Sequence, residues 1–198
     1  MDADAVEIRV LGCLIEKQRT TPDVYPLSLN ALRAACNQTT NREPVVAYDE
    51  PMIRAGLGRL ADKRWARLAS GAGSRAAKYR HLLEETLGLA DAELALLCVL
   101  MLRGPQTLGE LKQRTERLCR FGSLDEIEET LDALAERGLA ARLARRPGQK
   151  EQRFAQLLGG EEGVEAEPAL LPDDRVAALE ARVDRLEQQL ERLLEETR

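Results

Sequence analysis

The most constraining feature of this 198-residue chain is an internal repeat. The segment "LADKRWARLASGAGSRAAKYRHL" (residues 60–82) aligns with "LAERGLAARLARRPGQKEQRFAQL" (residues 134–157). Each copy has the pattern of a helix end, an apolar strand, a basic turn containing Gly, and a second strand that carries Tyr79 or Phe154. A chain that repeats one pattern in this way is expected to build the same structural unit twice.

The segments that precede each copy correspond as well. "AVEIRVLGCLIEK" and "DAELALLCVLMLR" are both apolar at helical spacing, and each is followed by a break containing Thr or Gly next to Pro. A short second helix is expected at 28–36 in one copy and at 108–114 in the other. A third helix follows, capped by Asp49 in the first copy and by Ser123 in the second. The positions expected to be buried on these third helices are Ile53, Leu57 and Leu60, and Ile127, Leu131 and Leu134.

Three helices followed by a two-stranded hairpin are the plan of the winged helix, a variant of the helix-turn-helix. The sequence therefore predicts a mainly α protein with small β-hairpins, in which two tandem winged-helix domains occupy residues 1–88 and 89–160. Residues 161–172 are acidic and rich in Gly and Pro, which indicates a linker.

After the linker, residues 173–198 change to a heptad period, which predicts a C-terminal coiled-coil helix. Valine at a with leucine at d favours a two-stranded form, and the charges at e and g favour parallel pairing, so a homodimer is expected. The alternative is an amphipathic helix that folds back on its own chain, since about three heptads are marginal alone. The residues predicted to dimerise are Val176, Leu179, Val183, Leu186, Leu190 and Leu193.

The composition argues against metal and catalytic chemistry. The four cysteines are far apart with no CxxC pair, and His81 is the single histidine. Cys13 and Cys98 lie in apolar helical runs, where a reduced cysteine is usually a small buried hydrophobe. Neither a phosphate-binding glycine loop nor a Ser/His/Asp set is present, so no cofactor, metal or enzymatic activity is expected.

No apolar run approaches the roughly 18–20 residues that span a bilayer, and the N-terminus lacks a signal-peptide pattern, so a cytoplasmic protein without a membrane partner is expected.

The segment "LGCLIEKQRTTPDVYPLSLNALRAACNQTTNREP", together with "SGAGSRAAKYRH" and "LRGPQTLGELKQR", resembles the YceH family of uncharacterised bacterial proteins. The match extends through the C-terminal heptads and so covers essentially the whole chain. The resemblance implies tandem winged helices and a coiled coil, and it implies no established reaction. Within this segment the asparagines are accounted for by capping and turns. Arg42 is not, and it is a candidate for phosphate contact beside Asn41.

Charge gives two interpretations of function. Residues 1–88 carry 13 Lys and Arg against 11 Asp and Glu, residues 89–160 carry 11 of each, and residues 161–198 carry 5 against 12. Neither predicted domain is strongly basic, and the third helix of the second copy is acidic enough to repel phosphate.

The favoured hypothesis is a regulator that binds duplex DNA through domain 1 and the basic wings. The alternative is a winged-helix adaptor that binds another protein through the small outer face of residues 51–62 and through the acidic helix. The candidate nucleic-acid-binding residues are Asn41, Arg42, Arg54, Arg59, Arg75, Lys78, Arg145, Arg146 and Lys150.

Overall fold

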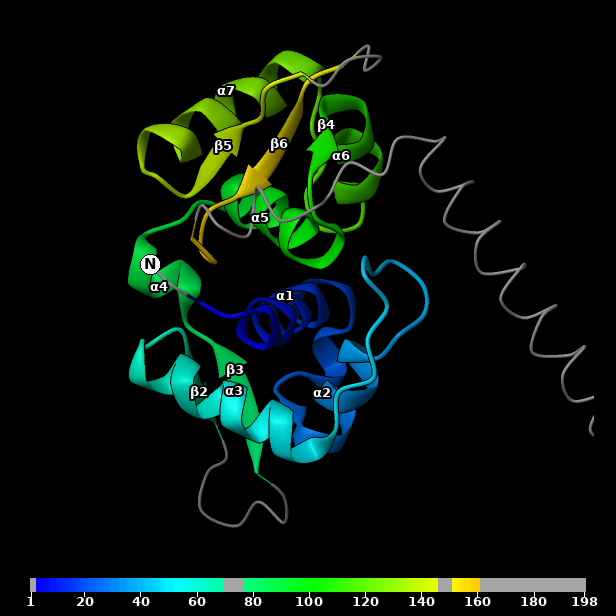
Figure 1. The fold of residues 1–198 in the computed structure, drawn as a ribbon, viewed down its shortest axis with the longest axis vertical. Coiled ribbons are helices and arrows are strands. Elements are labelled where there is room, and N and C mark those ends of the chain that lie inside the picture. Colours follow the sequence, from blue (N-terminus) through cyan, green and yellow to red (C-terminus); the bar gives the residue numbers. More distant parts are fainter. Residues whose placement is uncertain (1–2, 70–76, 146–150, 161–198) are drawn as a thin grey trace, which may run out of the picture. The chain divides into compact units, whose positions relative to one another are not determined.

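The computed structural model describes residues 3–69, 77–145 and 151–160 (Figure 1). Within these residues the protein is mainly helical, with two small antiparallel sheets. The first half contains α1 (Ala5–Thr20), the 3-10 turn η1 (Pro22–Val24), β1 (Leu27–Ser28), α2 (Leu29–Cys36), α3 (Glu50–Asp62), β2 (Ala66–Leu68), β3 (Lys78–His81) and α4 (Leu83–Leu87). The second half contains α5 (Asp91–Arg103), β4 (Gln106–Thr107), α6 (Leu108–Thr115), α7 (Leu124–Glu136), β5 (Ala140–Arg142) and β6 (Arg153–Gln156).

The two halves share one strand order, β1-β3-β2 in the first and β4-β6-β5 in the second. The repeated hairpins are confirmed, with Tyr79 and Phe154 on the central strand of each sheet. The two-residue strands β1 and β4 were not predicted, because two residues are too short to show a period. Ser28 and Thr107 each close such a strand and also cap the next helix, accepting a bond from the backbone N–H three residues on.

The predicted caps and buried faces of the third helices are confirmed. Asp49 accepts from the backbone N–H of Met52 at 2.9 Å, and Ser123 accepts from that of Glu126 at 3.1 Å. Each cap satisfies one of the free donors at a helix start. All six predicted positions on α3 and α7 are buried.

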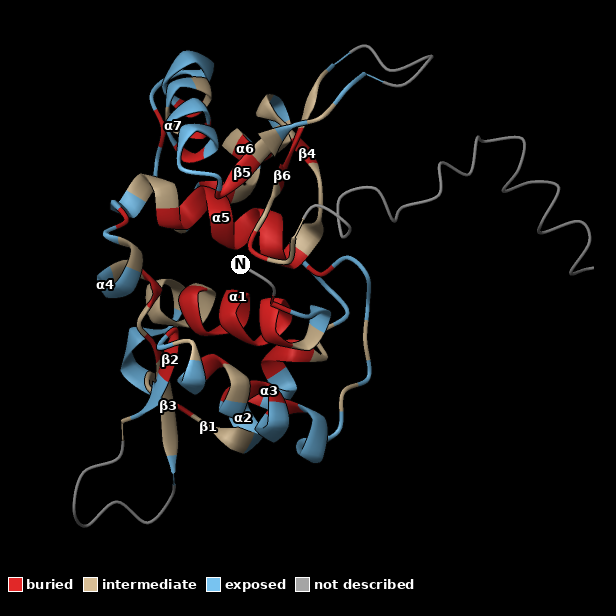
Figure 2. Cartoon of the chain, turned by 60° about the vertical axis from the view of Figure 1, so that its left-hand side comes forward, coloured by how far each residue is buried: buried red, intermediate tan, exposed pale blue. Residues whose placement is uncertain are grey.

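Helices α1 and α5 form the centre of the described unit (Figures 1 and 2). Residues 7–15 of α1 and 94–102 of α5 are buried on every face, which is more than an amphipathic pattern predicts. The cause is that each helix packs on its own half and on its counterpart in the other half. A Cβ atom on Gly12 would lie 2.9 Å from Cδ2 of Leu102, so glycine permits this close approach.

The described residues all belong to one compact unit. The predicted linker and the six predicted dimerisation residues lie outside the described residues. In the described part of the chain, no helix has the length and apolar character needed to span a membrane.

Candidate nucleic-acid interface

The loop between α2 and α3 is fixed by hydrogen bonds to its own backbone. The side chain of Asn37 donates to the carbonyl of Tyr48 and accepts from its N–H, both at 2.8 Å. The buried guanidinium of Arg9 donates to the carbonyls of Cys36 at 3.0 Å and Pro44 at 2.5 Å. These contacts agree with the prediction that the asparagine of this segment serves a turn.

Arg42 is also part of this internal network. It is only 4% exposed, and its two terminal nitrogens donate to the carboxylate oxygens of Glu16 at 3.0 and 2.6 Å. Its Nε donates to the carbonyl of Ala35 at 3.2 Å. We therefore correct the assignment of Arg42 to phosphate contact, because its guanidinium is bonded inside the protein and presents no donor to a surface.

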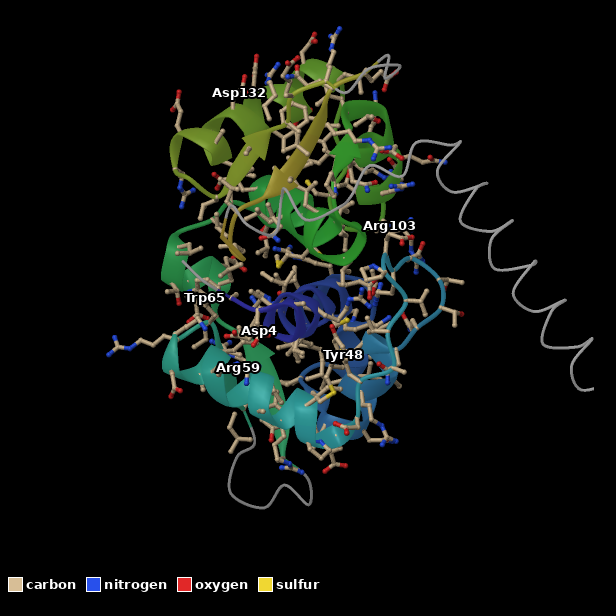
Figure 3. All side chains as sticks on the ribbon, viewed as in Figure 1. Asp4, Tyr48, Arg59, Trp65, Arg103 and Asp132 are labelled. Carbon is tan, nitrogen blue, oxygen red and sulfur yellow. The ribbon has the colours of Figure 1, made fainter. Side chains whose placement is uncertain are left out.

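Asn41 lies at the exposed tip of the same loop. Its φ of 60° is in the left-handed region, which asparagine tolerates better than most residues. Its side-chain oxygen accepts a hydrogen bond from Arg103. Figure 3 labels Arg103, which is the last residue of α5. Glu43 next to the loop tip donates its N–H to the carbonyl of Leu102 at 2.9 Å, so this loop connects the two halves.

The outer face of α3 is exposed and small, as predicted. Arg54 is exposed and pairs with Glu50 at 2.6 Å, one turn earlier on the helix. Arg59 is paired more firmly, at 2.6 Å to Asp4 and 3.4 Å to the buried Glu7, and Figure 3 shows Arg59 beside Asp4. Of the two predicted arginines on α3, Arg54 is therefore the one available to an incoming ligand.

A groove of about 240 Å³ runs between α3 and the first hairpin. Gly58 lines it and has nothing within 4 Å of an added Cβ, and Leu68, which also lines it, is 56% exposed. Arg54 and Arg67 line the groove. The predicted contact Lys78 lies half-buried on β3 and is not part of the lining. The predicted contact Arg75 falls outside the described residues.

The equivalent position in the second half holds Arg142, which occupies the place of Leu68 in the repeat and lines a cavity of about 330 Å³ with Glu128 and Phe154. Its guanidinium contacts Glu128 at 2.7 Å and Asp132 at 3.0 Å, and it covers the ring of Phe154 at 5.0 Å. These two carboxylates raise the pKa of Arg142. Asp132 points outward from α7 (Figure 3). Local patterns did not predict this bridge, although the repeat has an arginine at a position that is apolar in the first copy.

Other carboxylates of α7 remain exposed, and this helix matches the acidic character predicted for it. The exposed acidic residues are Asp125, Glu126, Glu129 and Glu136. Of the three predicted wing residues in this half, Arg145 is exposed, whereas Arg146 and Lys150 lie outside the described residues. The third helices of the two halves thus differ in charge, since α7 carries six carboxylates and no base, whereas α3 carries two carboxylates and two arginines.

Three of the four cysteines are buried, and Cys119 is half-buried. Cys13, Cys36 and Cys98 are buried and unbridged, and Cys98 donates to the carbonyl of Gly12 at 3.4 Å. Burial raises the pKa of the Cys98 thiol. The described ranges contain no group of three or more His, Cys, Asp or Glu side chains that could hold a metal ion.

Together these features define a class of protein: a duplicated three-helix-and-sheet unit joined through two central helices, with unlike surfaces on its two copies. The sequence matches the family described as "Protein of unknown function, DUF480" over residues 3–149. It is 52% identical over 197 residues to a UPF0502 protein of Pelobacter propionicus, covering 93% of this chain and 90% of that protein. It is 50% identical over 195 residues to a UPF0502 protein of Solibacter usitatus, covering 95% of this chain and 94% of that protein. The chain belongs to the DUF480/UPF0502 family, which confirms the resemblance to YceH.

Proposed function

We propose that each half is a winged-helix unit and that the protein is a non-enzymatic, nucleic-acid-binding regulator. Binding takes place through α3 and the hairpin of the first half, which contact the phosphate backbone of a duplex. The observation that carries this proposal is the contrast between the two helix–hairpin junctions. The first is a groove lined by Arg54 and Arg67. In the second, Arg142 is bonded to the acidic helix α7.

The order of elements supports the winged-helix assignment. Each half has a short strand, the second helix, the third helix and then a hairpin whose far strand pairs with that short strand. In this class of fold the third helix and the hairpin face the duplex. Base-specific readout normally uses Arg, Asn or Gln on the third helix. The exposed face of α3 offers Pro51, Ala55, Gly58 and Asp62 instead, so the contact is to the backbone and carries little sequence specificity.

An adaptor that binds another protein is the second candidate, and a separate observation favours it. Leu68, which lines the first groove, is 56% exposed, and Met52 in the first turn of α3 is 42% exposed. Large exposed apolar side chains beside a groove are typical of protein-interaction sites. The acidic face of α7 provides a second surface for such a partner.

Salt dependence distinguishes the two candidates. Backbone contacts release counterions, so the affinity for a random-sequence duplex falls steeply between about 50 and 200 mM salt. We expect Arg54→Gln to reduce the slope of log K against log salt by about one unit, because each lost phosphate contact releases roughly one counterion fewer. Fluorescence anisotropy with a labelled duplex measures both affinity and slope.

Arg120→Gln is a matched control. Arg120 is exposed and pairs with Glu116 four residues earlier, as Arg54 pairs with Glu50, but it lies in the second half. An equal loss of slope in the two variants would show that only net charge matters. No binding at about 50 mM salt and micromolar protein would favour the adaptor, because non-specific binders reach dissociation constants of roughly 10⁻⁴–10⁻⁶ M. A protein retained from nuclease-treated lysate and lost with Leu68→Glu would support the adaptor directly.

A further inference from the structure

A second concave site lies between the two halves, away from the helix–hairpin junctions. It encloses about 410 Å³, and its walls come from α1, the tip of the 37–48 loop, α5, and α6 with the turn that follows it. Its polar wall carries Arg103, Arg114 and Arg117, and its apolar wall carries Val99, Leu102 and Leu118. A concavity of this size that combines apolar side chains with polar groups has the volume of a small-molecule site.

The lining of this site has an excess of positive charge. Glu16 is its single carboxylate, and this carboxylate is already bonded to Arg42 at 2.6 Å and to Lys17 at 3.3 Å. Arg42 donates to both carboxylate oxygens of Glu16. The negative charge of Glu16 is therefore neutralised by Arg42 and Lys17, which do not line the site.

The three arginines are compensated much less. Arg103 bonds to the neutral amide oxygen of Asn41, and Arg114 pairs with Glu110 at 3.3 Å with both side chains partly exposed. Arg117 is exposed, and it makes no hydrogen bond or ion pair with any residue that the structure describes. Burial, followed by the charges of Arg114 and Arg42, lowers the pKa of Arg103. An anion bound in this site would relieve the repulsion between Arg103 and the neighbouring guanidinium groups.

We propose that this site binds a small organic anion. Its phosphate or carboxylate group lies against Arg103, Arg114 and Arg117, and a short apolar portion lies against Val99, Leu102 and Leu118. Guanidinium groups suit both oxyanions because they donate two parallel hydrogen bonds. A DNA duplex is too wide to enter a space of about 410 Å³. Because the walls belong to both halves, the ligand holds the 37–48 loop, α5 and α6 in their present arrangement.

Isothermal titration calorimetry on the full chain at constant ionic strength tests the site. The probes are n-butyl phosphate, inorganic phosphate, butyrate and n-butanol. We expect n-butyl phosphate to bind more tightly than inorganic phosphate, since it also buries apolar surface, and n-butanol not to bind. The butyrate titration shows whether a carboxylate serves as well as a phosphate.

The variants locate the binding. Arg103→Gln and Arg117→Gln should each weaken n-butyl phosphate binding about tenfold or more, as expected for the loss of a charge-assisted bond. Arg117 is exposed, so its replacement cannot be mistaken for unfolding. Arg120→Gln makes the same charge change outside the site and should leave binding unchanged. Equal weakening by Arg117→Gln and Arg120→Gln would overturn the proposal. Equal affinity of the wild type for n-butyl phosphate and for inorganic phosphate would also overturn it. A third contrary result would be that Arg117→Gln weakens the binding of a DNA duplex by the same factor as the binding of n-butyl phosphate.

Discussion

At the scale of single residues, Arg42 is a buried cation whose charge is neutralised by its bidentate ion pair with Glu16. Burial opposes the ionisation of Glu16, but Arg42, with a contribution from Lys17, holds the pKa of Glu16 below its ordinary value. Removing one partner of a buried pair leaves the other charge uncompensated, which usually costs about 3–5 kcal/mol. We expect Arg42→Ala to reduce the free energy of unfolding by about this amount in urea titrations.

Arg33→Ala on the exposed side of α2 is the control for Arg42→Ala, and its effect should stay within about 0.5 kcal/mol. In a Glu16→Gln background, Arg42→Ala should cost clearly less, because no carboxylate is left behind. Equal costs in the two backgrounds would contradict the pair as the source of stability.

His81 gives a prediction for pH. It is buried next to Gln18, and burial, then the charges of Arg19 and Arg80, lowers its pKa from 6.5 to about 4. Between these values the unfolded chain binds a proton that the native protein does not, so stability is full above pH 6.5 and is lost as the pH falls toward 4. We expect a loss on the order of 3 kcal/mol over this window. Urea titrations of the wild type and of His81→Gln at several pH values measure it.

Because His81 is the single histidine of the chain, one NMR signal reports its titration directly. A midpoint near 6.5 would contradict the buried neutral imidazole. An unchanged slope of stability against pH in His81→Gln would assign the dependence to other groups.

At the scale of elements, two glycines in helices should respond in opposite directions to the same substitution. Gly12 is where α1 meets α5, and an added Cβ would lie 2.9 Å from Leu102 and 3.2 Å from Met101. Overpacking of this kind costs typically 1–3 kcal/mol. Gly58 on α3 has nothing within 4 Å, so alanine there should add about 0.5–1 kcal/mol through helix propensity. Thermal and urea unfolding of Gly12→Ala and Gly58→Ala test both signs.

Each glycine substitution serves as the other's control, because the backbone effect of replacing glycine by alanine in a helix is the same in both. A stabilised Gly12→Ala would mean that the two central helices can separate without cost. The close packing of the two halves would then contribute little to stability.

At the scale of the whole molecule, the C-terminal heptads predict association of two chains. Leu186→Glu places a charge at a predicted d position of each helix and should reduce the solution mass to that of one chain. Deletion of residues 175–198 should have the same effect and leave the described unit folded. Light scattering measures the mass. Gln188→Glu, at a predicted f position, is the control and should not change it. A monomeric wild-type protein would favour the folded-back helix.

Much of the fold could be predicted from the sequence because local periodicity records which face of an element is buried. The capping residues Asp49 and Ser123, the buried faces of α3 and α7, and both hairpins followed from patterns within about 15 residues. The repeat strengthened these predictions, because each element deduced for one copy was also expected in the other. The strands β1 and β4 escaped because they have no local pattern and exist only through pairing with β3 and β6.

The functional surfaces depended on partners that are distant in sequence. Arg42 looks like a surface cation until α1 brings Glu16 to it, and Arg142 looks free until the hairpin folds over Glu128 and Asp132. The grouping of Arg103, Arg114 and Arg117 with the loop of the first half likewise exists only because α1 packs on α5. The sequence by itself determined the main helices, the two hairpins, the caps of the third helices and the duplication. The tertiary structure decided which charges are neutralised and which remain for a ligand, because charge compensation depends on distances in space that a local pattern does not contain.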